Sequence, residues 1–151
     1  MIVIVDYNVG NVGSIYNMIT KIGYESVISN DKDIIASASK LILPGVGSFD
    51  NGIQNLQNLD LFEVLNKKVL IDKTPILGIC LGMQLMAESS DEGKKKGLGW
   101  ISQNVEKLKP DECKLTTIPI LGWNYINVTR ENKLISSEKQ RYYFVHSYYF
   151  R

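Results

Sequence analysis

The stretch Pro75-Ile76-Leu77-Gly78-Ile79-Cys80-Leu81-Gly82-Met83-Gln84 decides how the rest of the sequence is interpreted. A short apolar run after Pro75 predicts a strand over 75–79, and the residues from Met83 to Glu88 predict a helix. Between them lies Gly-x-Cys-x-Gly, the spacing of a nucleophile elbow with cysteine in place of serine. A helix N-terminus favours a thiolate, and the Leu81 N–H is placed to stabilise an oxyanion. The alternative is a buried cysteine on a core strand that is followed by a glycine turn.

Composition limits the possible classes of protein. A length of 151 residues predicts a single domain, 1–151. Hydrophobic residues make up 44% of the chain and charged residues 22%, a composition that predicts a folded core. Lys and Arg number 17 against 16 Asp and Glu, which gives no basic surplus for nucleic acid. Two cysteines, Cys80 and Cys113, form no disulfide framework, and no Cys/His cluster suggests a metal. No leader peptide and no membrane-spanning run is recognisable, so a cytoplasmic protein is expected.

The first half of the chain has the pattern of an α/β protein. The run Ile2-Val3-Ile4-Val5 predicts a strand buried on both faces, as in parallel sheets. Ser14 is a candidate N-cap for a helix that Gly23 ends, and Asp60 is a candidate N-cap for a later one. Gly10 and Gly13 do not complete a dinucleotide-binding Gly-x-Gly-x-x-Gly motif. Further strands are expected over 24–29 and 40–43, and helices over 49–59 and 61–69.

A second glycine loop follows the strand over 40–43. In Pro44-Gly45-Val46-Gly47, two glycines around one valine allow the Gly45–Val46 peptide to reorient, so that its N–H becomes a second oxyanion donor. An ordinary turn is the alternative.

The second half is predicted to be β-rich and antiparallel. Its strands are expected over 105–108, 125–129 and 142–149, and the basic loop 91–97 is expected to be solvated. A cysteine nucleophile needs a base, and His146 is the only histidine, so a Cys80–His146 dyad is one hypothesis. A structural His146 in an aromatic strand is the other.

Taken together, these motifs resemble the class I, triad-type glutamine amidotransferases, and most of all the glutaminase subunits of imidazole glycerol phosphate synthase. The matching pieces keep the family's order along the whole chain. They are residues 6–14, Leu43-Pro44-Gly45-Val46-Gly47-Ser48-Phe49, Gly78-Ile79-Cys80-Leu81-Gly82-Met83-Gln84, Gly97-Leu98-Gly99, Gly122-Trp123-Asn124 and Tyr143-Phe144-Val145-His146-Ser147-Tyr148. The resemblance implies an open, mostly parallel sheet flanked by helices, with a β-rich C-terminal part.

The resemblance also implies roles for individual residues. Cys80 forms a glutamyl thioester with glutamine, and ammonia passes through a tunnel to a (βα)8-barrel synthase subunit in histidine biosynthesis. No cofactor is implied. The oxyanion is held by Gly45, Val46, Gly47 and Leu81. Glutamine is held by Gln84, His146, Ser147 and Tyr148. The partner-facing residues are Asn8, Gly10, Asn11, Ser14, Trp123 and Asn124.

The sequence departs from the family pattern at two places. The family's base and its carboxylate lie in a His-Pro-Glu motif, which is absent from the 151 residues, and His146 aligns with a substrate-contacting strand. The expectation is a C-terminally truncated chain with little glutaminase activity alone and a tendency to self-associate. Many family members also carry a histidine after the proline that corresponds to Pro119, where this chain has Ile120.

Three alternatives remain open at this point. A related amidotransferase subunit would serve sugar amidation in surface-polysaccharide biosynthesis. A degenerate amidotransferase fold would be a non-catalytic regulatory module that docks on a partner. A Cys–His hydrolase using His146 would need neither the Pro-Gly-Val-Gly loop nor Gly-Trp-Asn.

Overall fold

The structure is a computed structural model that describes residues 1–110, 117–135 and 140–151. The chain divides into two compact units: unit 1 is Met1–Glu106 with Phe150–Arg151, and unit 2 is Lys107–Tyr149. Among the described residues, no helix is both long and apolar enough to cross a membrane. Cys113 falls outside the described residues, as does any prediction that depends on it.

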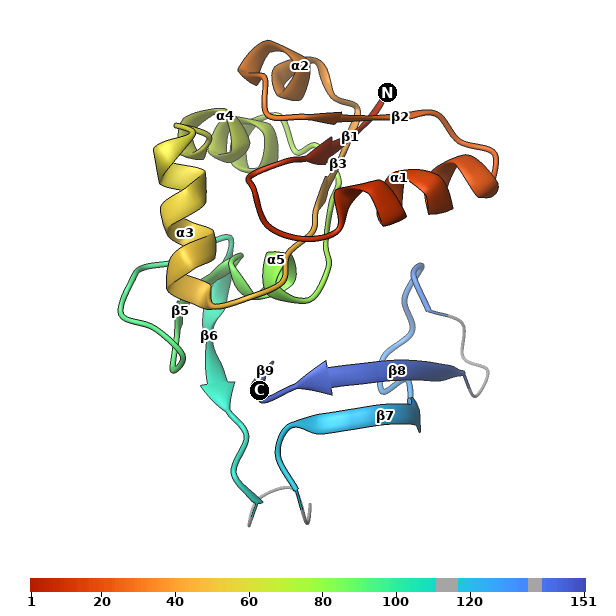
Figure 1. Cartoon of the computed structure of the whole chain (residues 1–151), viewed down its shortest axis with the longest axis vertical. Helices are drawn as coiled ribbons and strands as arrows, with labels where there is room; N and C mark the ends of the chain where they lie inside the picture. Colours follow the sequence, from red (N-terminus) through yellow and green to blue (C-terminus); the bar gives the residue numbers. More distant parts are fainter. Residues whose placement is uncertain (111–116, 136–139) are drawn as a thin grey trace. The chain divides into compact units, whose positions relative to one another are not determined.

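Unit 1 is built on a four-stranded parallel sheet with the order β2-β1-β3-β4 (Figure 1). The predicted α/β fold with an open parallel sheet is therefore confirmed. The strands are β1 (Ile2–Val5), β2 (Ser26–Ser29), β3 (Lys40–Leu43) and β4 (Ile76–Gly78). Val3, Ile4 and Val5 are all fully buried, as expected for a central strand that is covered on both faces.

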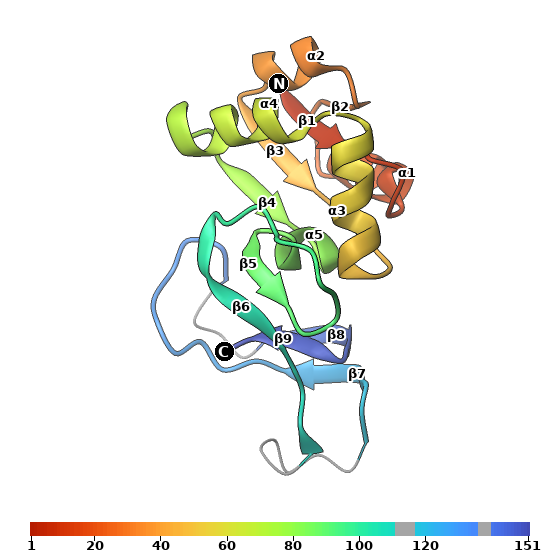
Figure 2. The ribbon, with the colours of Figure 1, turned by 90° about the vertical axis from the view of Figure 1, so that its left-hand side faces the viewer.

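Helices cover both faces of this sheet (Figure 2). Helix α1 (Val12–Lys21) packs on β1 and β2. The side chains of Val3 and Val5 belong to the main core, together with apolar residues of α2 (Lys32–Ser37), α3 (Phe49–Asn58) and α4 (Phe62–Asn66). Because strand side chains alternate, Ile4 points to the opposite face. The π-helix η1 (Lys67–Ile71) continues directly from α4.

Several helix boundaries differ from the sequence-based predictions. The N-cap of α1 is Asn11, whose side-chain oxygen accepts the Ser14 N–H at 3.0 Å, so the prediction of Ser14 as the cap is wrong. Asp60 does not cap α4, because the helix starts after Leu61 without a side-chain cap. Asp60 instead has φ of 54° and forms an ion pair with Lys32. The short helix α2 was not predicted. The Asp31 side chain caps it by accepting the Asp33 and Ile34 N–H groups.

The segment after the cysteine elbow is a short helix followed by a strand. Helix α5 covers only Leu81–Gln84, and strand β5 (Ala87–Ser90) follows, so the predicted helix from Met83 to Glu88 is wrong. Strand β5 pairs in parallel with β6 (Ile101–Lys107), which is longer than the strand predicted over 105–108. The sheet order is β5-β6-β9, with β9 covering Tyr148–Phe150. Pairing with β6 overrides the helical propensity of this segment.

Unit 2 contains an antiparallel pair. Strand β7 (Ile120–Tyr125) pairs with β8 (Arg141–His146), and Trp123 lies opposite Tyr143. The predicted antiparallel character therefore holds for this pair but not for β5 and β6. The strand predicted over 125–129 is displaced: it ends at Tyr125, where the prediction begins it.

Candidate active site

Cys80 lies where β4 turns into α5, at the carboxyl end of the parallel sheet. Its backbone has φ of 52° and ψ of −117°, a conformation that non-glycine residues rarely adopt. Its side chain is exposed and its sulfur is free of any disulfide. A strained turn that presents an exposed nucleophile between strand and helix is what an elbow requires. The alternative of a buried core cysteine does not agree with this exposure.

The two elbow glycines are required by close backbone contacts. A Cβ on Gly78 would come within 2.5 Å of the Met83 Cα, and a Cβ on Gly82 would overlap the Leu43 carbonyl oxygen. The same Leu43 oxygen accepts the Ile79 N–H at 3.0 Å, so the end of β3 directly contacts the elbow. Substituting either glycine would push the elbow away from its neighbours.

The Pro44–Gly47 loop packs against this elbow. A Cβ on Gly45 would lie 2.8 Å from the Gly82 nitrogen, and a Cβ on Gly10 would lie 3.3 Å from the Gly45 nitrogen. Three loops at the carboxyl ends of β1, β3 and β4 thus meet around Cys80. Open α/β sheets bind their ligands at this edge. All of these residues belong to unit 1.

Tyr7 supports the Pro44–Gly47 loop, and the sequence analysis did not single it out. Its side chain is fully buried, and its hydroxyl donates a hydrogen bond to the Pro44 carbonyl oxygen. Burial raises the pKa of the Tyr7 hydroxyl, and the nearby negative charge of a Cys80 thiolate raises it further. Tyr7 therefore stays protonated and remains a hydrogen-bond donor. The signal in the sequence is slight: a tyrosine two residues beyond a buried strand.

The backbone donors proposed for the oxyanion have no competing acceptor. In residues 1–110, 117–135 and 140–151, no hydrogen bond uses the N–H of Gly45, Val46, Gly47 or Leu81. Val46 is exposed, and Gly47 has φ of 107° with open space around it. Leu81 begins α5, where helix N–H groups lack partners within the helix. The geometry allows these donors to bind a negative oxygen, and their role stays a prediction.

The residues predicted to hold glutamine lie in both units. Gln84 is buried on α5 in unit 1. His146, Ser147 and Tyr148 lie in unit 2. The His146 Nδ1 lies 3.0 Å from the Tyr148 carbonyl oxygen. A carbonyl only accepts, so the His146 Nδ1 is the donor in this contact. The roles of these four residues, and the Cys80–His146 dyad, stay predictions.

The residues predicted to face a partner are mostly exposed, each within its own unit. Asn8, Asn11 and Ser14 are exposed in unit 1, and Gly10 is partly exposed. Trp123 and Asn124 are exposed on β7 in unit 2, and Trp123 is 61% exposed. Their exposure permits a contact, and the contact itself stays a prediction.

Two carboxylates near the Pro44–Gly47 loop were also not predicted from the sequence. The Glu92 Oε2 accepts the Phe49 N–H at 2.8 Å, and Asp50 accepts the backbone N–H groups of Lys94 and Lys95. These donors lower the pKa of the Asp50 carboxyl, Lys95 first and Lys94 next. The contacts join residues more than 40 positions apart, so no local pattern could reveal them. No group of three or more metal-ligating side chains occurs among the described residues.

Comparison with known proteins finds proteins of similar sequence. The chain is 55% identical over 152 residues to "Imidazole glycerol phosphate synthase subunit HisH 2" of Methanococcus maripaludis, with 99% of this chain and 74% of that protein covered. It is 42% identical to the protein of the same name from Pseudomonas aeruginosa, with the same shares covered.

A solved structure described as "Crystal structure of glutamine amidotransferase" shares the fold. Its TM-score is 0.74 at 16% identity, with 99% of this chain and 73% of that chain covered. The sequence profile of the family "Glutamine amidotransferase class-I" matches residues 3–151. The protein belongs to the class-I glutamine amidotransferase family.

Proposed function

We propose that this chain is the glutaminase subunit of an imidazole glycerol phosphate synthase, and that it supplies ammonia to a (βα)8-barrel synthase subunit in histidine biosynthesis in the cytoplasm. The observation that carries the proposal is Cys80 on a strained elbow, with the Pro44–Gly47 loop packed against it. The names of the relatives, "Imidazole glycerol phosphate synthase subunit HisH", support the choice of acceptor enzyme.

The chemistry follows from the elbow. The Cys80 thiolate sulfur attacks the side-chain amide carbon of glutamine, and the amide oxygen becomes an oxyanion. The N–H groups of Leu81 and of the Gly45–Gly47 segment stabilise that charge, an effect worth about 10²–10³ in rate for one donor. When the carbon–nitrogen bond breaks, the nitrogen leaves with an added proton as ammonia. Water then hydrolyses the thioester to glutamate and restores the thiol.

Proton transfer in this reaction needs a general base and a general acid. The thiol proton must be removed and the leaving nitrogen must receive one, yet the 151 residues contain no His-Pro-Glu sequence and a single histidine. We therefore propose that these 151 residues alone hydrolyse glutamine slowly. Losing one member of a cooperating catalytic group commonly lowers the rate by several orders of magnitude, roughly 10⁴ or more.

The test combines binding, labelling and turnover. The chain is mixed with the barrel subunit of an imidazole glycerol phosphate synthase, and complex formation is followed by sedimentation. Cys80 is exposed to a chloroketone analogue of glutamine, with Cys80→Ser as the control. We expect a heterodimer and labelling of Cys80 that glutamine slows. A chain that binds the barrel subunit but is not labelled would be a regulatory module instead. A chain that neither binds nor is labelled would overturn the proposal.

A further inference from the structure

The Pro44–Gly47 loop is fixed firmly at its N-terminal end. The Tyr7 hydroxyl donates to the Pro44 carbonyl, and the Leu43 carbonyl accepts the Ile79 N–H. Pro44 and Gly45 are both buried. The start of the loop therefore cannot shift without moving the elbow that carries the nucleophile.

The C-terminal end of the loop is fixed from a distant part of the chain. The loop runs into α3 through Ser48, which occupies the N-cap position but makes no side-chain capping hydrogen bond. The first N–H groups of a helix need an outside acceptor. For Phe49 that acceptor is the Glu92 carboxylate, which lies 43 residues further along the chain.

Asp50 makes the reciprocal contact. Its Oδ1 accepts the Lys94 N–H at 3.0 Å and the Lys95 N–H at 2.9 Å, and its Oδ2 also lies 3.0 Å from the Lys94 nitrogen. A Cβ on Gly93 would overlap Asp50 Oδ1, so glycine permits the close approach. We call the contacts of Phe49 and Asp50 with Glu92, Gly93, Lys94 and Lys95 the α3–loop clasp.

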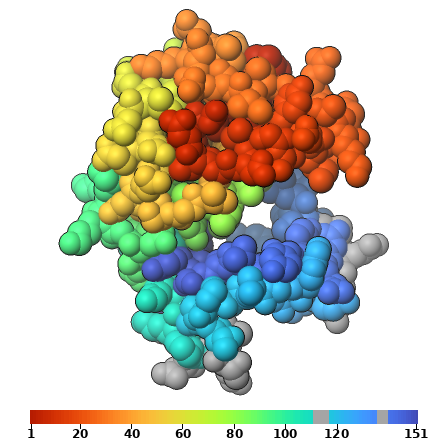
Figure 3. All heavy atoms as spheres, in the orientation of Figure 1, coloured from red at the N-terminus to blue at the C-terminus, as the bar shows by residue number. Residues whose placement is uncertain are grey.

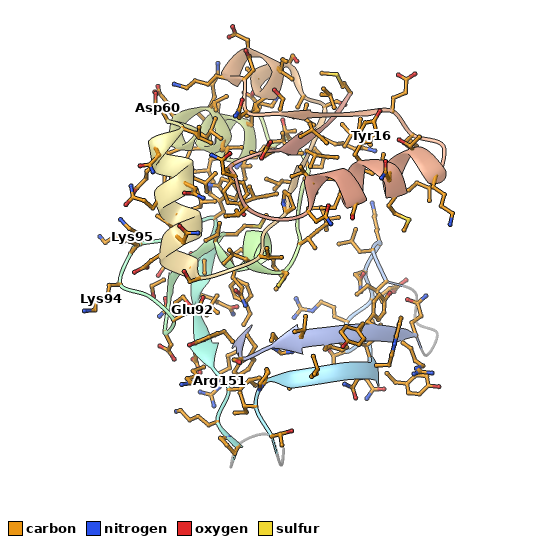
Figure 4. The ribbon with its side chains drawn as sticks, viewed as in Figure 1. Tyr16, Asp60, Glu92, Lys94, Lys95 and Arg151 are labelled. Atoms are coloured by element: carbon orange, nitrogen blue, oxygen red, sulfur yellow. The ribbon has the colours of Figure 1, made fainter. Side chains whose placement is uncertain are left out.

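The clasp joins two segments that are far apart in sequence and adjacent in space. Glu92, Lys94 and Lys95 lie beside the start of α3 (Figure 4). In the space-filling view, the yellow atoms of α3 adjoin the green atoms of the 91–97 segment (Figure 3). The basic loop is thus more than the solvated segment expected from the sequence: its backbone amides hold an acidic residue of the helix.

Between the two anchors, only the middle of the loop is unconstrained. Val46 is 61% exposed, and a Cβ on Gly47 would meet nothing within 4 Å. A peptide that reorients here changes the donors offered to the oxyanion while both ends stay in place. We propose that Asp50 is a positioning residue of the glutaminase reaction: through the α3–loop clasp it fixes the C-terminal end of the Pro44–Gly47 loop.

This inference rests on the proposed glutaminase function, and the variants are chosen to separate the two. Asp50→Ala removes every side-chain acceptor of the clasp at that position. Asp50→Asn keeps Oδ1, which accepts both backbone N–H groups. Gly93→Ala disrupts the clasp from the opposite side. Asn51→Ala changes the exposed neighbour on α3 and is the matched control. Each is measured in the complex with the barrel subunit.

Two readouts are compared: the steady-state kinetics and hydrogen exchange of the Phe49 amide. In Asp50→Ala, we expect kcat to fall about 10- to 100-fold, more than KM rises, because a misplaced catalytic group lowers the rate by this order. Exchange at Phe49 should accelerate, and Asp50→Asn should restore both readouts to near the parent values. Asp50→Ala and Gly93→Ala combined should be no worse than either one alone, since both break one contact.

Each outcome counts for or against the inference. If Asp50→Ala matches Asn51→Ala in kcat, or if only the exchange rate changes, the positioning role is overturned. If Asp50→Ala does not fold, Asp50→Asn and Gly93→Ala decide by the same two readouts. If Cys80 of the parent complex is not labelled by the chloroketone analogue, the proposed function fails. The clasp is then judged by exchange at Phe49 and at Gly47, and unchanged exchange in Gly93→Ala overturns it.

Discussion

The two units of this protein are stabilised in different ways. Unit 1 contains every fully or nearly fully buried hydrophobic residue of the described chain except Leu108. The β7–β8 pair of unit 2 leaves one face open, with Leu121 65% and Val145 56% exposed. On that face Trp123 and Tyr143 pack edge to face with ring centroids 5.7 Å apart. Burial stabilises unit 1, whereas cross-strand side-chain pairs stabilise the described part of unit 2.

The chemistry follows the same division. The nucleophile, its glycine elbow and the Pro44–Gly47 loop all lie in unit 1, which has the packed core. A strained backbone persists only where its surroundings over-determine it, and the packed core of unit 1 supplies such surroundings. The open face of unit 2 is suited to contact rather than to catalysis. The predictions below test this contrast, beginning with the largest expected effect.

The largest effect is expected at the strained residue of unit 1. Cys80→Gly removes the nucleophile, so labelling by the chloroketone analogue and whatever glutamine hydrolysis the complex carries out should both be lost. Glycine adopts φ of 52° without steric strain, so the free energy of unfolding should rise by about 1 kcal/mol. Activity assays and urea denaturation of the same preparation measure the two changes. A less stable Cys80→Gly would mean that the elbow is not strained.

The next prediction compares how replacing a leucine in each unit changes the free energy of unfolding. Leu65 is fully buried in the core of unit 1, and Leu121 is 65% exposed on β7. Leu65→Ala should lower the free energy of unfolding by about 2–5 kcal/mol, because it leaves a cavity. Leu121→Ala should change it by less than about 0.5 kcal/mol. Equal losses in urea denaturation would show that the β7–β8 face is covered after all.

A smaller effect is expected for the aromatic pair. Trp123→Ala removes the edge-to-face contact with Tyr143 and the stacking of Arg141, whose guanidinium carbon is 5.6 Å from the Trp123 ring centroid. An aromatic pair adds about 0.5–1.5 kcal/mol beyond its buried area. The near-ultraviolet circular dichroism of unit 2 should weaken, while kcat stays within about threefold when the complex is saturated. Asn127→Ala, beyond the end of β7, serves as the control.

The smallest effect concerns pH. The backbone N–H groups of Lys95 and Lys94 hold the pKa of the Asp50 carboxyl below its usual range. A lowered pKa in the folded state means that the carboxylate contributes stability above the unfolded value and loses it as pH falls through the folded one. Stability should therefore decline below about pH 4 in the parent and decline less in Asp50→Asn. Thermal unfolding between about pH 2 and pH 6 measures the difference. Parallel curves for the two proteins would refute it.

Parts of the fold were predictable because their signals are local. The apolar runs of β1 and β3 predicted strands with the observed bounds, and the helix over 49–59 was recovered to within one residue. The apolar residues of α1 and its C-cap are not all covered: Ile19 is buried, but Met18 and Ile22 are 58% and 61% exposed. Apolar spacing alone does not show which face a sheet covers.

The errors have physical causes that depend on distant parts of the chain. Strand β5 forms because β6 pairs with it, which overrides a helical composition. The elbow and its glycines were predictable because the motif is compact. The support of the loop was not, since Tyr7 reaches Pro44 and Glu92 reaches Phe49 only in the folded chain. A local pattern identifies the nucleophile, whereas tertiary contacts hold its surroundings.

The contact between Leu43 and the elbow has a consequence for insertions and deletions. Leu43 pairs with Gly78, and its carbonyl oxygen lies against Gly82, so the nucleophile and the Pro44–Gly47 loop share one strand register. Adding or removing a residue at the carboxyl end of β3 or β4 would displace Cys80 relative to the Pro44–Gly47 loop. We expect changes of length to be tolerated better at the amino ends of these strands, where they leave the elbow and the Pro44–Gly47 loop in register. Homologues that differ in length should therefore differ at that opposite edge of the sheet.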